Sequence, residues 1–540
     1  MSTATQWWRG GVIYQIYPRS FADSNGDGIG DLEGIRESLE YVARLGVDGI
    51  WISPFFPSPM KDFGYDVAEY CDVDPMFGTL ADFDNLVAEA HRLGLAVMID
   101  QVLSHSSDAH AWFEESRQDR TNPKADWYVW ADAQPDGAPP NNWQSVFGGP
   151  AWQWDTRRCQ YYLHNFLPSQ PDLNHHNPEV RQALTDAMRF WLDRGVDGFR
   201  LDAINFAFHD RKLRDNPPAE ADPYADGEPP DNPYMFQDHV YDKSRPEMPT
   251  LLRELRSLAD EYGDICLLAE IGDDSSRSRD LMAEYTGGND KLHMGYSFDL
   301  LSEDGSPAHI RKMVEGVERT IDDGYPCWSI GNHDVPRVVT RWGSEAPPEA
   351  VAPVYAAMLL ALRGGLCLYQ GDELALPEAE LSYDQLQDPV GIAMWPRNKG
   401  RDGCRTPMPW RADDPGAGFT TGTPWLPIPD AHRERAVDRQ AQRPDSVMER
   451  VRRLLHWRRQ HPALTDGSLT FLEAPAEVLM LCRDHREERV IAAFNLSGET
   501  VRVPWPSGEP PEALAGHGFG GEIADSGISL PPYDAFFGRL

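Results

Sequence analysis

The stretch VDGFRLDA, residues 196–203, decides the fold. Its short apolar run is typical of a buried strand, and Arg200 and Asp202 lie near the end of that run. A helical pattern precedes the strand. Asn177-Pro178 supplies an N-cap and a first helical position, and apolar residues from 180 to 191 follow on one stripe. A helix that leads into such a strand is the repeating unit of a parallel α/β sheet.

The same unit recurs along the chain. Helical patterns at 32–45 and 82–93, for example, lead into apolar runs rich in β-formers. Eight parallel strands interleaved with helices predict a (β/α)₈ TIM barrel. The predicted strands are residues 12–17, 49–52, 96–100, 196–201, 265–269, 294–298, 327–330 and 365–369.

Long connections divide the chain further. Residues 105–173, rich in Trp, Asn and Pro, exceed an ordinary βα loop and predict an inserted subdomain B between barrel parts 1–104 and 174–467. A second acidic, Pro-rich connection, 211–248, has two interpretations, a disordered loop or a lid over the barrel mouth, and the first is preferred. Residues 468–540 contain short alternating segments and predict a C-terminal β-sandwich domain, with strands expected at 478–481, 490–494 and 501–505.

Composition and charge exclude several classes of function. With 41% hydrophobic residues the 540-residue chain can bury a sizeable core, which excludes global disorder. Its 50 Lys and Arg against 86 Asp and Glu give a net charge of −36, so nucleic acid and acidic membranes are unfavourable partners. Seven scattered cysteines contain no C-x-x-C pair, and neither a signal peptide nor a membrane span is evident. We expect a cytoplasmic monomer or homodimer that acts on a small molecule.

Polar residues gather where the predicted strands end, which is where barrel enzymes build their active sites. One acid at a strand end is often a helix cap or a salt-bridge partner. Several together predict a site. The residues concerned are Asp100, His105, Arg200, Asp202, Glu270, Asn332, His333 and Asp334.

Two of these acids fit the cleavage of a glycosidic bond. One carboxylate attacks the anomeric carbon, and a second carboxylic acid protonates the leaving oxygen. Arg200 lies two residues from Asp202, on the same face of the strand, and we expect it to keep Asp202 ionised. A less polar environment would keep Glu270 protonated. These features predict Asp202 as nucleophile and Glu270 as acid/base.

These segments resemble the catalytic motifs of glycoside hydrolase family 13, the α-amylase superfamily. QPDLN at 170–174, DFGYD at 62–66, Arg401-Asp402 and RTPM at 405–408 are similar to its oligo-1,6-glucosidase subfamily. The resemblance implies a retaining exo-α-glucosidase with no organic cofactor. Its substrates would be short α-1,4-glucosides such as maltose.

The resemblance also implies the remaining roles. Asp334 would hold two hydroxyls of the terminal glucose and stabilise the transition state, with His105 and His333 as further hydroxyl partners. Tyr65 would stack on the sugar face, and Phe166 would line the pocket. Asp62 and Arg401 would pair at the pocket floor and enforce exo attack; without the resemblance, they would be read as an ordinary surface ion pair.

The resemblance assigns linkage specificity to Ala203, which directly follows the predicted nucleophile Asp202. In the subfamily, Val at this position accompanies α-1,6 activity and Ala or Thr accompanies α-1,4 activity. The alternatives are an oligo-1,6-glucosidase, a sucrose- or trehalose-converting isomerase or glucosyltransferase, and, more remotely, a non-catalytic binding subunit.

A cation site is predicted in the first βα loop, where oxygen ligands fall on alternate residues and glycines permit a tight turn. The resemblance implies Ca²⁺ or Mg²⁺ there. The alternative is a Gly-rich turn in which Asp31 caps the next helix. A second, interdomain calcium is not expected, because Ser104 replaces the family's usual Asn. The predicted loop ligands are Asp23, Asn25, Asp27, the Ile29 carbonyl and Asp31.

Overall fold

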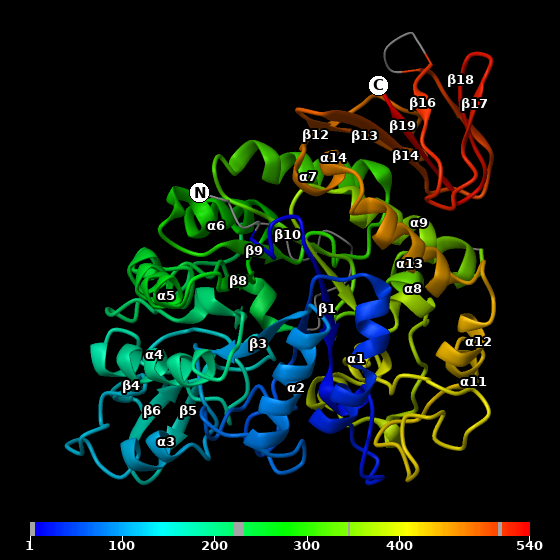
Figure 1. The fold of residues 1–540 in the computed structure, drawn as a ribbon. Coiled ribbons are helices and arrows are strands. Elements are labelled where there is room, and N and C mark those ends of the chain that lie inside the picture. The colour runs from blue at the N-terminus through cyan, green and yellow to red at the C-terminus, as the bar shows by residue number, and fades with distance from the viewer. Residues whose placement is uncertain (1–5, 221–231, 344–345, 506–509) are drawn as a thin grey trace.

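The computed structural model describes residues 6–220, 232–343, 346–505 and 510–540. Eight parallel strands form one sheet in the order β10-β11-β1-β2-β3-β7-β8-β9, and a parallel bridge between Gly295 and Pro326 joins its two edges. This arrangement confirms the predicted barrel (Figure 1). The barrel strands are β1 (Val12–Ile16), β2 (Gly49–Ile52), β3 (Ala96–Val102), β7 (Gly198–Asp202), β8 (Cys266–Ile271), β9 (Met294–Ser297), β10 (Cys327–Ser329) and β11 (Gly365–Tyr369).

Helices surround the sheet and bury the apolar stripes seen in the sequence. Caps fix their starts: Asp31 accepts a hydrogen bond from Gly34 N, and Thr79 forms a capping box with Asp82. The larger helices are α1 (Leu32–Leu45), α2 (Leu80–Arg92), α4 (Pro178–Leu192), α5 (Met248–Tyr262), α6 (Ser275–Thr286), α7 (Pro307–Thr320), α9 (Pro348–Ala361) and α13 (Val447–Arg458). The shorter ones are α3 (Ala111–Ser116), α8 (Val338–Arg341), α10 (Pro389–Met394), α11 (Asp430–Arg433), α12 (Val437–Ala441) and α14 (Pro462–Asp466).

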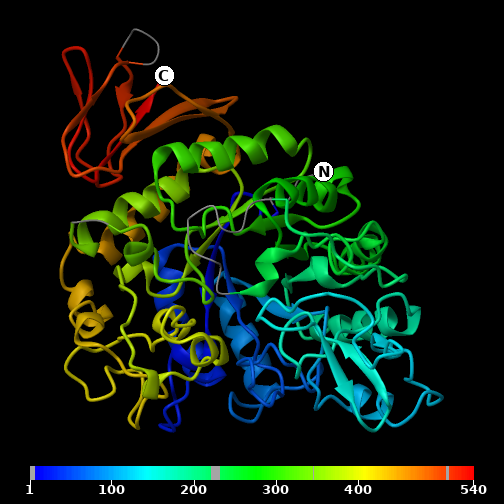
Figure 2. The ribbon, with the colours of Figure 1, turned by 180° about the vertical axis from the view of Figure 1, so that it is seen from behind.

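Two further units flank the barrel at opposite ends of the molecule, in both views (Figures 1 and 2). The inserted segment after β3 carries a small antiparallel sheet of β4 (Trp130–Ala131), β6 (Gln160–Leu163) and β5 (Trp152–Asp155), in that order. The C-terminal part forms two antiparallel sheets, which confirms an all-β unit. Their strands are β12 (Ser468–Phe471), β13 (Val478–His485), β14 (Glu488–Asn495), β15 (Val501–Val503), β16 (Glu512–Ala513), β17 (Glu522–Ala524), β18 (Gly527–Leu530) and β19 (Ala535–Arg539).

The acidic connection 211–248 is more ordered than expected. Residues 221–231 lie outside the described residues, but Pro218 bridges Gln237, and the Asn142 side-chain amide donates to the carbonyl of Asn216. The preferred interpretation as a disordered loop is therefore wrong for the described flanks. The bond from Asn142 comes from the inserted segment, a partner that the sequence of the loop alone does not disclose.

Within the described part of the chain, no helix is both long enough and apolar enough to cross a membrane.

Candidate active site

The register of the barrel strands brings the predicted catalytic residues together. Asp100 pairs with Arg200 across β3 and β7, and Glu270 pairs with Tyr296 across β8 and β9. Residues two apart on a strand share a face, so Arg200 and Asp202 point the same way. All five side chains are buried at the C-terminal ends of their strands.

Arg200 is the centre of this cluster. Its Nη1 atom contacts Oδ1 of Asp202 at 2.5 Å and Oδ1 of Asp100 at 2.8 Å, and its Nη2 atom contacts Oε1 of Glu270 at 2.6 Å. Arg200 contacts Asp202, as their shared strand face predicts, but burial raises the pKa of Asp202, so the expectation that Arg200 keeps this acid ionised stays a prediction. Burial raises the pKa of Glu270, as expected, but the expected contrast with Asp202 is wrong, because the same guanidinium contacts both acids.

Burial dominates the protonation of this cluster. It raises the pKa of Asp202 and of Glu270 to about 7 each and that of Asp100 to about 6, while Arg200 opposes the shift at all three. One cation cannot compensate three buried carboxylates, so the cluster retains a proton near neutral pH. An acid and a base can therefore coexist here, as a double displacement requires.

Asp334 has the opposite environment. Burial alone would raise its pKa, but the His333 ring and the cationic Arg405 and Arg401 hold the pKa well below its ordinary value. Oδ1 of Asp334 lies 2.9 Å from Nη2 of Arg405 and 3.4 Å from Nη1 of Arg401. Asp334 is therefore a permanently ionised acceptor at the rim of the cluster.

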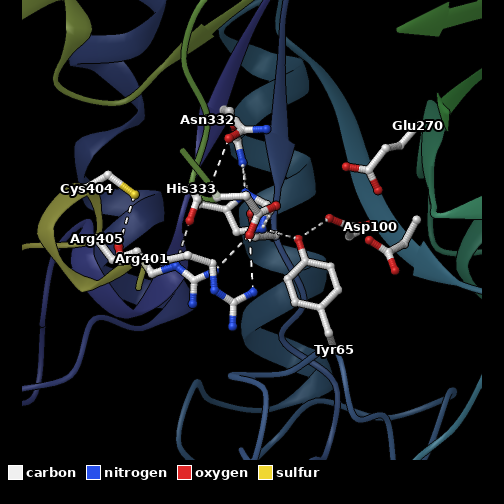
Figure 3. Close-up of polar contacts among 12 residues, drawn as sticks. Tyr65, Asp100, Glu270, Asn332, His333, Arg401, Cys404 and Arg405 are labelled. Carbon is white, nitrogen blue, oxygen red and sulfur yellow. Dashed lines mark hydrogen bonds and ion pairs between the residues drawn. The ribbon is translucent and has the colours of Figure 1, made fainter. Parts of the chain in front are cut away.

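Tyr65 connects His333 to the carboxylates, as Figure 3 shows. Its hydroxyl lies 2.6 Å from Nε2 of His333 and donates to Oδ2 of Asp100 at 3.0 Å, and its ring stacks on the His333 ring at 5.3 Å and 8°. The opposite ring nitrogen of His333 lies 2.8 Å from Nε2 of Gln15. One face of Tyr65 is thus covered by His333, and the predicted stacking on a sugar would use the other.

Burial lowers the pKa of His333 to about 3 and that of His105 to about 4, so both rings are neutral at pH 7. His105 comes from the loop after β3. Its Nε2 atom lies 3.0 Å from the carbonyl of Tyr65, and its ring lies 5.1 Å from that of Phe166. Ser104 contacts Nδ1 of His105 at 3.0 Å.

Asp62 and Arg401 form a buried pair. Nη2 of Arg401 lies 2.7 Å from Oδ1 of Asp62, and the two side chains are only 5% and 12% exposed, which excludes an ordinary surface ion pair. Oδ2 of Asp62 accepts from the side-chain amide of Gln170 at 3.0 Å, and Arg401 also donates to both carboxylate oxygens of Asp388. This network ties the inserted segment to the loop after β11.

Ala203 has a left-handed backbone, with φ 38° and ψ 41°, a conformation that is uncommon for residues other than glycine. The turn aims its N–H at Oε2 of Glu270, 3.0 Å away. Ala203, the residue after Asp202, therefore holds Glu270 through its main chain.

Several residues that contact the site were not predicted from the sequence. Tyr296 lies within the predicted strand 294–298 and was given no role, and Asp388 lies in a segment where no element was predicted. Arg405 belongs to the RTPM segment, which was noted without a role for its arginine. Only the strand register and the long-range ion pairs identify these three residues.

The loop 23–31, which is predicted to bind a cation, is held in a tight turn by hydrogen bonds from its backbone to its own side chains. Asp23 accepts from the N–H groups of Gly26 and Gly28, and Asp27 accepts from that of Ile29. The side chain of Asp31 caps α1, as the alternative interpretation stated. Among the described residues, no three His, Cys, Asp or Glu side chains are grouped so that they could hold a metal ion.

The fold and this acid–arginine cluster define a barrel glycosidase. The sequence matches the family Alpha amylase, catalytic domain, over residues 15–467, and the chain belongs to that family, glycoside hydrolase family 13.

Similar proteins narrow the group. The chain is 56% identical to a probable α-glucosidase of Rhizobium meliloti (strain 1021) over 539 residues, which cover 99% of this chain and 97% of that protein. It is 37% identical to an oligo-1,6-glucosidase of Heyndrickxia coagulans, over 98% and 99% of the two chains.

Solved structures agree with this placement. The α-glucosyl transfer enzyme XgtA superimposes with a TM-score of 0.94 at 55% identity, over 99% of this chain and 100% of that one. The trehalulose synthase MutB of Pseudomonas mesoacidophila MX-45 gives a TM-score of 0.88 at 32% identity, over 99% of each chain. The chain is a glycoside hydrolase of the group that contains α-glucosidases and oligo-1,6-glucosidases.

Proposed function

We propose that this protein is a retaining exo-α-glucosidase that removes the non-reducing terminal glucose from short α-1,4-glucosides such as maltose. The observation that carries the proposal is the contact of Asp202 and Glu270 with the two terminal nitrogens of one guanidinium, that of Arg200. Such an arrangement holds the acids a few ångströms apart. Retaining glycosidases keep theirs about 5 to 5.5 Å apart.

In this mechanism Asp202 attacks the anomeric carbon while Glu270 gives its proton to the leaving glycosidic oxygen. The anomeric C–O bond breaks and a glucosyl–Asp202 ester forms. Glu270, now a carboxylate, takes a proton from an incoming hydroxyl, whose oxygen displaces Asp202 and restores the α configuration. Asp334 remains ionised throughout and stabilises the positive charge that develops at the anomeric carbon.

The buried Asp62–Arg401 pair supports exo attack. It lies at the same site as Asp334, because Arg401 contacts both carboxylates. Charged groups that are held this rigidly can hydrogen-bond the outer hydroxyls of one terminal glucose and block a longer chain behind it.

Glucosyl transfer is a second candidate outcome of the same chemistry. The solved structure at 55% identity is named an α-glucosyl transfer enzyme, and a sugar hydroxyl can replace water in the second displacement. Alanine at position 203, which accompanies α-1,4 activity in the subfamily, supports a preference of this protein for α-1,4 over α-1,6 linkages.

We propose that the loop 23–31 binds a Ca²⁺ or Mg²⁺ ion with a structural role. The support is the sequence pattern, since Asp23, Asn25 and Asp27 place oxygen donors, the type that a hard cation prefers, at alternate positions. The ion would stabilise the start of α1 and takes no part in the chemistry. We also propose a cytoplasmic location, which the seven free cysteines support.

A time course of products from maltose, isomaltose and sucrose tests the proposed activity. Glucose from maltose, with little change of isomaltose, would support an α-1,4-glucosidase. New oligosaccharides in place of free glucose would indicate transfer, and isomerised sucrose would indicate the isomerase alternative. No reaction with any of the three would refute the proposal.

A further inference from the structure

Tyr296 is a buried tyrosine in β9 that lies directly opposite Glu270 in the strand register. Both residues belong to the barrel sheet, so the neighbouring strands fix the distance between them. The Tyr296 hydroxyl lies 3.1 Å from Oε1 of Glu270 and 2.9 Å from Nη2 of Arg200. The hydroxyl therefore contacts both Glu270 and the cation that pairs with it.

The chemistry of arginine fixes the direction of these hydrogen bonds. A guanidinium has only donors, so the Tyr296 oxygen accepts from Nη2 of Arg200 and also from its Nε at 3.2 Å. The single hydroxyl hydrogen of Tyr296 is then left for Oε1 of Glu270. Burial raises the pKa of Tyr296 well above its usual value, and the hydroxyl keeps this hydrogen at neutral pH.

The two oxygens of Glu270 therefore differ. Oε1 faces two donors, the Tyr296 hydroxyl and Nη2 of Arg200, and Oε2 faces one weaker donor, the N–H of Ala203. A proton on Oε1 would point at the Tyr296 hydroxyl and at Nη2 of Arg200, which both donate to the same oxygen. A proton on Oε2 leaves both of them satisfied.

We propose that Tyr296 is a positioning residue for the acid/base: with Arg200 it keeps Oε1 of Glu270 as an acceptor, so that the proton given to the leaving group is carried on Oε2. This inference rests on the proposed function. After proton transfer, the Tyr296 hydrogen stabilises the carboxylate that Glu270 becomes.

The acidic groups facing Glu270 do not make this distinction. Asp202 from β7, Asp100 from β3 and Asp334 after β10 set only the general field at Glu270. Together with Arg200, only Tyr296 donates to Oε1 among the described residues. The variant Tyr296→Phe removes that donor and retains the ring.

Tyr296→Phe, tested in the full chain, should slow the cleavage of substrates whose leaving group must be protonated. A hydrogen bond to a charged group contributes about 1.5 to 3 kcal/mol, so kcat/KM for maltose should fall about 10- to 100-fold, mainly through kcat. α-Glucosyl fluoride has a leaving group that needs little protonation, and its turnover should change less than about 3-fold.

The same variant should move the pH profile. Because a donor to the carboxylate favours its charged form, losing the donor raises the pKa of Glu270, and the alkaline limb of kcat/KM for maltose should move up by about one pH unit. 3-Fluorotyrosine at position 296, whose hydroxyl is a stronger donor and whose size is nearly unchanged, should move the limb down. This second variant tests the inference even if Tyr296→Phe folds poorly.

Tyr14→Phe is the matched control, since Tyr14 is a buried barrel tyrosine whose hydroxyl donates to a different acid, Glu373, at 2.7 Å. It should leave the maltose-to-fluoride ratio and the alkaline limb unchanged. Equal losses on both substrates in Tyr296→Phe, with an unmoved limb in both 296 variants, would overturn the inference. A wild-type enzyme inactive on maltose and on the fluoride would instead refute the proposed function.

Discussion

Nη2 of Arg200 lies 2.6 Å from Oε1 of Glu270, although the two residues come from different strands, β7 and β8. The same guanidinium contacts Asp202 through its other terminal nitrogen. The proposed nucleophile and the proposed acid/base are therefore held by one buried cation, and their protonation states depend on each other.

Activity should fall as the pH rises through about 7. Burial raises the pKa of Glu270 to about 7, and a raised carboxyl pKa means that the acid keeps its proton below that value and loses it above. The kcat/KM for maltose should therefore show an alkaline limb near neutrality. A profile that stays flat from about pH 6 to pH 9 would show that Glu270 is not the acid.

Asp62→Asn should weaken the grip on the terminal glucose. The change removes a charge that contacts Arg401 at 2.7 Å but keeps the shape, and Asp388 still neutralises the arginine. We expect kcat/KM for maltose to drop about 10- to 100-fold, the value for a hydrogen bond to a charged group.

The control for Asp62→Asn is Lys61→Ala, which breaks the exposed pair of Lys61 with Asp108 next to it. Lys61→Ala should leave maltose cleavage within about 2-fold, because exposed pairs contribute little. If both variants behave alike, the pair of Asp62 with Arg401 has no role at the subsite.

Ala203→Val should raise the ratio of isomaltose to maltose cleavage and lower the stability. Ala203 has φ 38°, where a β-branched side chain costs about 1 to 3 kcal/mol. Ala203→Gly tolerates the same backbone and should be at least as stable as wild type, with an unchanged ratio. An unchanged ratio in the valine variant would remove Ala203 as the specificity residue.

Chelation should lower the melting temperature if the loop 23–31 binds its ion. An ion present at 100 times its Kd stabilises the fold by about 2.7 kcal/mol, which corresponds to a shift of several degrees. The melting temperature after EDTA should recover with added Ca²⁺ or Mg²⁺, and Asp27→Asn should reduce the recovery. Identical melting curves with EDTA and with Ca²⁺ would argue against the site.

The sequence predicted the barrel because its strands and helices have distinct apolar periods. Strand 49–52 matches β2, and strand 365–369 matches β11. The strand ends are less well defined: β3 continues to Val102 and β7 starts at Gly198. Hydrogen bonds between neighbouring strands set these ends, and those pairings depend on the register of the whole sheet.

The site was predictable where its residues follow strands, as with Asp202 and Glu270. Tyr296 was not, since its importance depends on standing opposite Glu270 in the register. Asp388 acts on Arg401 from a loop with no pattern. The prediction that Asp202 and Glu270 have different environments was wrong, because a sequence does not show that a single arginine reaches both acids.

The central claim is that Asp202 carries the glucosyl group, and trapping that ester tests it most directly. The Glu270→Gln variant, treated briefly with α-glucosyl fluoride and digested, should give a hexose adduct on the peptide containing Asp202, because the fluoride leaves without an acid and the second step lacks its base. Asp202→Asn should give no adduct and lose at least about 10⁴-fold in kcat while still folding. A hexose on another residue, or Asp202→Asn activity above about a tenth of wild type, would contradict the account.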